Sequence, residues 1–314
     1  MPVPTDIHNH FADSDRFCHP DWDAVASLID DEIEACQREA SWDEVCLMWL
    51  ERLRTQATGD YRIHEMGRCL LLTDASDRIA LRSLSVATAT IQWLEQRFPG
   101  VFSGTGYGKH IILVFSEIDD YYRYIAHFDS DGEHPMSQGT CVYGSGYVHI
   151  VLLATHFEYL SPVLVHELTH ACLAHLPIPV WINEALAMRV EYEICRTGVP
   201  KLDREIYERH KRHWNPESIQ DFWSGRSWRI PGDSFELAYG LAYVLWHKME
   251  VDVQTSSDQF AAFLLGAHFH DGGQAAYKDV FDHSLFELAT GFLGPGEWEP
   301  RPGTWSQFFD SSEG

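Results

Sequence analysis

Five consecutive residues, His166-Glu167-Leu168-Thr169-His170, have the types and the spacing of a metal-dependent hydrolytic site. On an α-helix, positions i and i+4 lie one above the other on the same face, so both imidazoles can bind one metal ion. Glu167 lies about 100° around the helix axis, where it can hydrogen-bond a water on the metal without binding the metal itself. The pattern predicts His166 and His170 as metal ligands and Glu167 as a general base.

The residues around this motif favour a buried site over a solvent-facing helix. Residues 163–165 read Val-Leu-Val, Leu168 lies inside the motif, and Ala171-Cys172 follow it. Polar side chains in such apolar surroundings are costly to bury unless they find partners. A bound metal ion would supply that partner.

Catalytic zinc has three protein ligands and an open position for water, so a third ligand is needed. His175 follows His170 by five residues, a spacing that turns its side chain away from the metal-facing stripe. Glu184 lies in Pro-Val-Trp-Ile-Asn-Glu-Ala-Leu-Ala, after a short turn bounded by prolines that allows a second helix to fold back beside the first. We predict Glu184 as the third ligand and Zn²⁺ as the cofactor.

The elements that must position these residues can be read from local patterns. Ser161-Pro162 is a helix opening and Leu176-Pro177 a helix end, and a second helix is expected at 181–196. Upstream, the patterns predict a strand at 110–115, a helix capped by Ser116 that runs through Tyr124, and a hairpin of strands 140–143 and 147–153.

The flanking regions are predicted to be mainly helical. Apolar residues at three-to-four spacing predict helices in an N-terminal region that shows no strand signal, and in the C-terminal part. These ranges are 21–54, 77–98, 234–251, 258–265 and 284–292. The tail from Gly294 is expected to be extended or frayed.

Composition restricts the possible partners. Lys and Arg total 23 against 47 Asp and Glu, which gives a formal net charge of −24. Such a surface repels phosphate backbones and anionic lipid, so we expect neither nucleic-acid nor membrane binding. The start lacks the features of a secretory signal, and the seven cysteines form no CxxC pair. A cytoplasmic protein with reduced thiols is predicted.

The motif and the segment after Pro179 together resemble the gluzincins, the thermolysin-type zinc peptidases, and especially their bacterial peptidase MA-like branch. There the second helix reads like Pro-x-Trp-x-x-Glu-Gly-x-Ala. The resemblance extends over roughly residues 105–293. It implies an α+β, zincin-like fold, in which a small mixed sheet packs on the motif helix and a mostly helical lobe follows. The expected domains are a helical region at 1–104, a peptidase domain at 105–293 and a tail at 294–314.

The resemblance also implies a peptide or protein substrate and a tyrosine that donates a hydrogen bond to the oxyanion. Tyr239 lies where that tyrosine is expected, with Tyr243 one turn further on as a substitute. Two positions depart from the family pattern. Met188 replaces an aspartate that orients a zinc-bound histidine, and Ala185 replaces a glycine. The residue that orients the imidazoles is therefore not predicted.

Three alternatives stay open. The first is an amidohydrolase, because Asp6-Ile-His8-Asn-His10 resembles the Asp-x-His-x-His opening of that class, although the region lacks its alternating strands and helices. The second is a zinc-stabilised protein that binds a partner without catalysis. The third is a metal-free helical protein.

Overall fold

The computed structural model describes residues 3–12, 17–102, 107–128, 137–144, 147–154, 157–251 and 255–305. The chain divides into two compact units. Unit 1 comprises residues 1–93 and 103–174, and unit 2 comprises residues 94–102 and 175–314.

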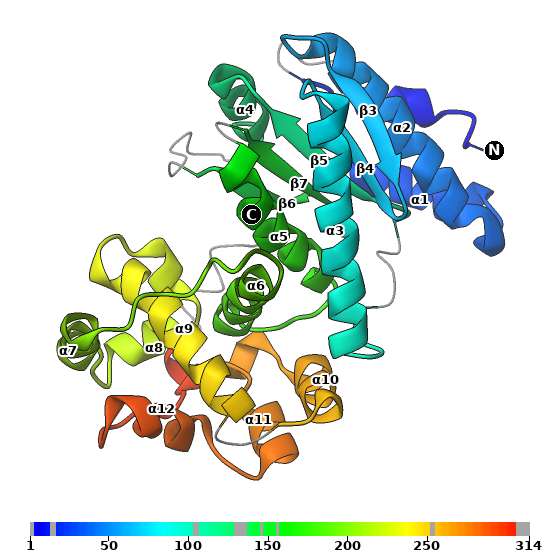
Figure 1. The fold of residues 1–314 in the computed structure, drawn as a ribbon. Coiled ribbons are helices and arrows are strands. Elements are labelled where there is room, and N and C mark those ends of the chain that lie inside the picture. The colour runs from blue at the N-terminus through cyan, green and yellow to red at the C-terminus, as the bar shows by residue number, and fades with distance from the viewer. Residues whose placement is uncertain are drawn as a thin grey trace. The chain divides into compact units, whose positions relative to one another are not determined.

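A five-stranded mixed sheet forms the centre of unit 1 (Figure 1). Its order is β3-β4-β5-β7-β6, with parallel pairs in the middle and an antiparallel pair at each edge. The strands are β3 (Arg62–Met66), β4 (Cys69–Thr73), β5 (His110–Phe115), β6 (Gly139–Gly144) and β7 (Tyr147–Leu153). A separate antiparallel pair joins β1 (Phe11–Ala12) and β2 (His19–Pro20).

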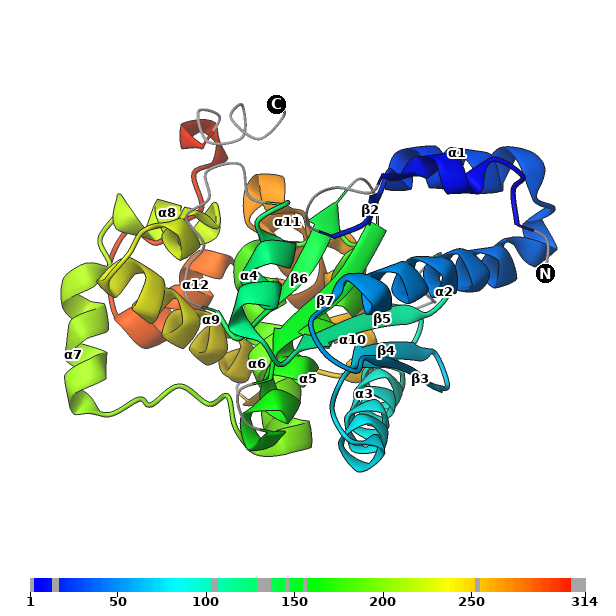
Figure 2. The same cartoon turned by 90° about the horizontal axis from the view of Figure 1, so that it is seen from above.

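Helices cover both faces of this sheet. The strands β4 and β5 are buried at every position, as expected for central strands covered on both sides. One face packs against α1 (Trp22–Glu32), α2 (Arg38–Gln56) and α4 (Ile118–Ile125) in a single hydrophobic cluster. On the other face, α5 (Phe157–Leu173) packs against β6 and β7. Figure 2 shows α2 and α3 (Asp77–Arg97) on opposite sides of the sheet.

The prediction of an N-terminal region without strands is wrong for β3 and β4. In β3 (Arg-Ile-His-Glu-Met) no residue is fully buried and Glu65 is exposed, so the strand shows no buried face. The five residues of β4 are too few to separate a buried strand from a helix by periodicity. Gly67, at φ +56°, supplies the left-handed turn between them. The predicted domain boundary at residue 104 lies outside the described residues, and the sheet combines strands from both sides of it.

Other sequence predictions near the sheet are confirmed or shifted. The strand at 110–115 and the antiparallel pairing of β6 with β7 are confirmed, while residues 145–146 of the expected turn lie outside the described residues. Ser116 does not cap α4, because the helix begins one residue later and its N-cap is Glu117; the Ser116 hydroxyl donates to Asp74. Helix α5 begins at Phe157 rather than Ser161, so Pro162 lies inside it, and it ends at Leu173. The mixed α+β class is therefore confirmed.

Unit 2 contains the remaining helices. They are α6 (Val180–Cys195), α7 (Arg204–His213), α8 (Ser218–Trp223), α9 (Asp233–Val251), α10 (Ser257–Gly266), α11 (Gln274–Phe281) and α12 (Leu285–Leu293). The predicted helices correspond to α6, α9, α10 and α12. The sequence analysis missed α7, which is too polar to show an apolar stripe and is capped instead by Asp203, whose carboxylate accepts from Ile206 N.

The tail, which the sequence predicts to be extended or frayed, is not frayed up to residue 305, because it is bonded to α8. Gln220 of α8 donates to Glu299 O (2.9 Å) and accepts from Arg301 N (2.7 Å). Trp305 is fully buried, and its indole donates to Gln220 Oε1 at 3.2 Å. The polar sequence of the tail gives no sign of these contacts, because the residues that it bonds lie about eighty positions earlier in the chain. Residues 306–314 lie outside the described residues.

Within the described ranges, no helix combines the length and the apolar character needed to cross a membrane.

Candidate metal centre

The motif residues lie in the second half of α5, the helix that packs on β6 and β7. The imidazoles of His166 and His170 are neighbours, with ring centroids 4.8 Å apart and planes at 83°. His170 is only 8% exposed, and His166 and Glu167 are half-buried. The i, i+4 spacing therefore places two imidazoles on one helix face, as predicted.

Glu184 completes a three-residue group with these histidines. It lies in the second turn of α6, and six residues connect this helix to α5. One ligand atom from each of His166, His170 and Glu184 lies within 4.8 Å of the others, so the group could hold a metal ion. This group is the only one of its kind in the described part of the chain.

The donor set fits zinc. Two imidazole nitrogens and one carboxylate oxygen are ligands that zinc accepts, and tetrahedral bonds of about 2.1 Å place neighbouring ligands roughly 3.4 Å apart. The three ligand atoms lie within 4.8 Å of one another, a wider limit than that spacing, so the side chains would have to move closer to bind one ion. Three protein donors also leave a fourth position for water or substrate.

The side chain of Glu167 lies close to β6 and α4. Gly139 of β6 has no side chain at the point where α5 approaches, and a Cβ there would lie 3.2 Å from Glu167 Cγ. Tyr121 of α4 is buried, and its hydroxyl bonds Ser137 Oγ at 2.9 Å. Burial raises the pKa of Tyr121 to about 12, and the negative charge of Glu167 adds to the effect. The same charge adds to burial in raising the pKa of Cys141, so both side chains stay protonated beside the carboxylate.

Replacing Gly139 with alanine is expected to lower the free energy of unfolding by about 1–3 kcal/mol, the usual cost of overpacking. The added Cβ would lie 2.5 Å from Val163 Cγ1 and 2.7 Å from Leu152 Cδ2, so strand and helix must separate. Urea denaturation measures the change. The matched control is Gly303→Ala, where a Cβ meets nothing within 4 Å. Equal stability of the two variants would contradict this account.

Tyr239 is half-buried on α9, which packs against α6. Its ring contacts those of Trp228 and Phe235, at centroid distances of 6.0 and 5.3 Å. Tyr243 stacks on His247 instead, and its charged neighbours include Arg189, five residues beyond Glu184 on α6. The assignment of an oxyanion donor to Tyr239 stays a prediction.

Residues that the sequence analysis set aside have other roles in the structure. His175 bonds Val101 O through Nε2, at 3.0 Å. Met188, at the position of the family's aspartate, is 4% exposed and belongs to the core. The segment Asp6 to His10 forms a turn and the 3₁₀-helix η1 (Ile7–His10), not the end of a barrel strand, and it contributes no residue to a metal-binding group among the described residues.

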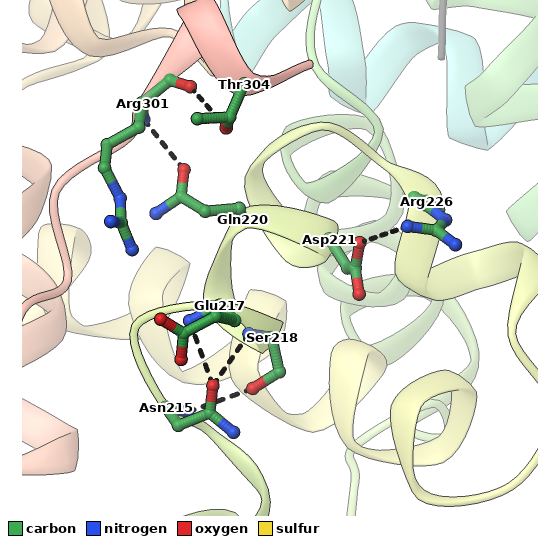
Figure 3. Close-up of a pocket in the computed structure, with 8 residues that line it drawn as sticks. All are labelled: Asn215, Glu217, Ser218, Gln220, Asp221, Arg226, Arg301 and Thr304. Atoms are coloured by element: carbon green, nitrogen blue, oxygen red, sulfur yellow. Dashed lines mark hydrogen bonds and ion pairs between the residues drawn. The ribbon is translucent and has the colours of Figure 1, made fainter. Parts of the chain in front are cut away.

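A pocket of about 440 Å³ lies elsewhere in unit 2, around α8 and the C-terminal segment (Figure 3). Its polar groups largely bond one another. Asn215 Oδ1 accepts from the amides of Glu217 and Ser218, at 2.9 and 3.0 Å, and Arg226 pairs with Asp221 at 3.2 Å. None of the predicted site residues lines it. We interpret this pocket as part of the surface of unit 2 against which the C-terminal segment packs.

The structure adds two residues that the sequence analysis did not connect with the site. They are Gly139, next to Glu167, and Tyr143, whose hydroxyl donates to His170 O at 3.2 Å. A glycine inside a strand pattern signals close approach of another backbone or side chain and could have pointed to the first. No local signal identifies the second, because its partner is a main-chain oxygen on another element.

No protein-family model matches the chain, and no curated protein matches it in a sequence comparison.

Proposed function

We propose that the chain is a zinc-dependent metallohydrolase that cleaves peptide bonds, of the gluzincin type that its motifs resemble. The observation that carries the proposal is the grouping of His166, His170 and Glu184 within 4.8 Å, with Glu167 adjacent on α5. A bound zinc ion would polarise the scissile carbonyl and lower the pKa of water toward ~7.

The residues of the chain then have distinct tasks. His166, His170 and Glu184 hold the ion. Glu167 accepts a proton from the attacking water and delivers it to the leaving amine, a role that contributes roughly 10²- to 10⁴-fold in rate. Tyr239 donates a hydrogen bond to the developing oxyanion.

The edge strand β6 is suited to hold an extended peptide. Its outer side pairs with no other strand in the described part of the chain, so its main-chain groups can bond a substrate by strand addition. The strand β6 also lies beside helix α5, because Gly139 adjoins Glu167 and the Tyr143 hydroxyl bonds His170 O. A peptide on β6 would therefore lie next to the general base.

Digestion of a peptide library by the full-length, zinc-loaded chain tests this function. We expect cleavage that stops when a chelator removes the metal and returns when zinc is added back. Zinc binding without cleavage of any peptide would favour the zinc-stabilised binding protein and contradict the enzyme.

A further inference from the structure

The edge strand β6 and helix α5 meet along one side of the strand (Figure 1). Alternate residues of a strand face the same side, so Gly139 and Tyr143 share a face. Gly139 adjoins Val163 and Glu167, and the hydroxyl of Tyr143 reaches His170 O. Positions 163, 167 and 170 form one stripe of the helix, at spacings of four and three residues. The strand β6 therefore contacts the face of α5 that contains the proposed general base, Glu167, and the proposed metal ligand His170.

The carbonyl that Tyr143 contacts lies in the last turn of α5, where main-chain hydrogen bonding is incomplete. The helix ends at Leu173, so the carbonyl of His170 is one of the last four, which have no regular intrahelical donor. The amide of Ala174, four residues on, bonds Ala171 O instead, at 3.5 Å. A hydroxyl donor at 3.2 Å satisfies the His170 carbonyl at the negative end of the helix dipole.

The position of Tyr143 is not explained by core packing. The residue is 54% exposed, and it lies near the end of the edge strand β6. Its hydroxyl is nevertheless bonded to the main chain of a residue whose side chain belongs to the metal-binding group. We propose that Tyr143 is a positioning residue for the metal centre, which fastens the last turn of α5 to β6 and so fixes the direction of the His170 imidazole.

The inference rests on the proposed function only in taking the three-residue group as a zinc site. Without the hydroxyl, the turn that carries His170 would have more freedom, and zinc binding would have to restrict that freedom. The Tyr143→Phe variant removes the hydroxyl, and with it the hydrogen bonds to His170 O and to the Cys141 side chain, and retains the ring. We expect zinc to bind this variant about fivefold more weakly, the effect of losing one net hydrogen bond.

The experiment measures the zinc Kd of the full chain by competition with a chromophoric chelator, for wild type and Tyr143→Phe. The visible absorption spectrum of the cobalt-substituted forms adds a readout of ligand geometry, which a general loss of stability does not move. The matched control is Tyr207→Phe, which removes a tyrosine hydroxyl that donates to another main-chain oxygen, Phe292 O, at 3.4 Å in unit 2. We expect wild-type affinity and an unchanged cobalt spectrum for this control.

Several outcomes would overturn the inference. Equal zinc affinity and cobalt spectra of wild type and Tyr143→Phe would do so, and so would equal weakening in Tyr207→Phe. A raised KM with unchanged zinc binding would assign Tyr143 to substrate contact instead. In these cases wild type still binds zinc and hydrolyses peptides, so the proposed function stands. A wild-type chain that binds no zinc would overturn both.

Discussion

Substitution of Glu167 by glutamine is expected to lower kcat for peptide hydrolysis by roughly 10²- to 10⁴-fold while zinc remains bound. The amide preserves the size of the side chain in the narrow space next to Gly139, so α5 and β6 keep their contact. It cannot accept the proton of the attacking water. The three predicted ligands are untouched, because Glu167 lies outside the metal-binding group. Steady-state kinetics on a cleaved library peptide, combined with zinc analysis of the same sample, measures both quantities.

Glu117→Gln provides a matched control for this prediction. Glu117 is exposed at the start of α4, and its side chain makes no capping bond. The same chemical change at this position should leave kcat at the wild-type value. Full activity of the Glu167→Gln variant would end its assignment as the general base, even if zinc is bound.

Substitution of Glu184 by alanine is expected to weaken zinc binding more than about 100-fold. Changing residues that merely orient metal ligands already costs roughly 10- to 100-fold in affinity, and this change removes a ligand itself. The helix should persist, because its core residues Trp181, Leu186 and Met188 are unchanged and buried. Competition with a chelator of known affinity measures the zinc Kd, and circular dichroism follows the helix content.

Glu191→Ala is the matched control for Glu184. Glu191 lies seven residues further along α6, two turns on, and it is not a member of the metal-binding group. Its loss should leave the zinc Kd unchanged. If Glu184→Ala binds zinc as tightly as Glu191→Ala does, the third ligand is another residue.

The candidate site was predictable from sequence because short-range geometry determines most of it. The i, i+4 rule brings two imidazoles together, and a six-residue connection to the next helix limits where Glu184 can lie. Position 188 shows the limit of the resemblance. Methionine there packs into the core, so the family pattern names no residue that orients the imidazoles.

The surroundings of Glu167 were less accessible to sequence reasoning because they depend on which strand lies beside the helix. The strand β6 is separated from the motif by β7 in the chain, and no local rule pairs Gly139 with Glu167 or Tyr143 with His170. In the same way, the anchoring of Trp305 depends on a glutamine far away in the sequence.

Errors in the fold predictions have a similar origin. The short strand β3 pairs with β4, and β4 pairs in turn with β5, so the stability of both depends on neighbouring strands and their own five residues carry little signal. Helix α7 is stabilised by its Asp203 cap and by its packing on α9, although most of its residues are polar. Predictions succeeded where periodicity and capping agreed, as in α10 and α12, and failed where tertiary partners decide the structure.

Elemental analysis of the purified full-length chain tests the central claim most directly. After equilibration with excess zinc and removal of the unbound ion, we predict one zinc ion per wild-type chain and almost none in the Glu184→Ala variant. A wild-type chain that retains no zinc, or a variant that retains the full amount, would contradict the assignment of His166, His170 and Glu184 as the metal centre.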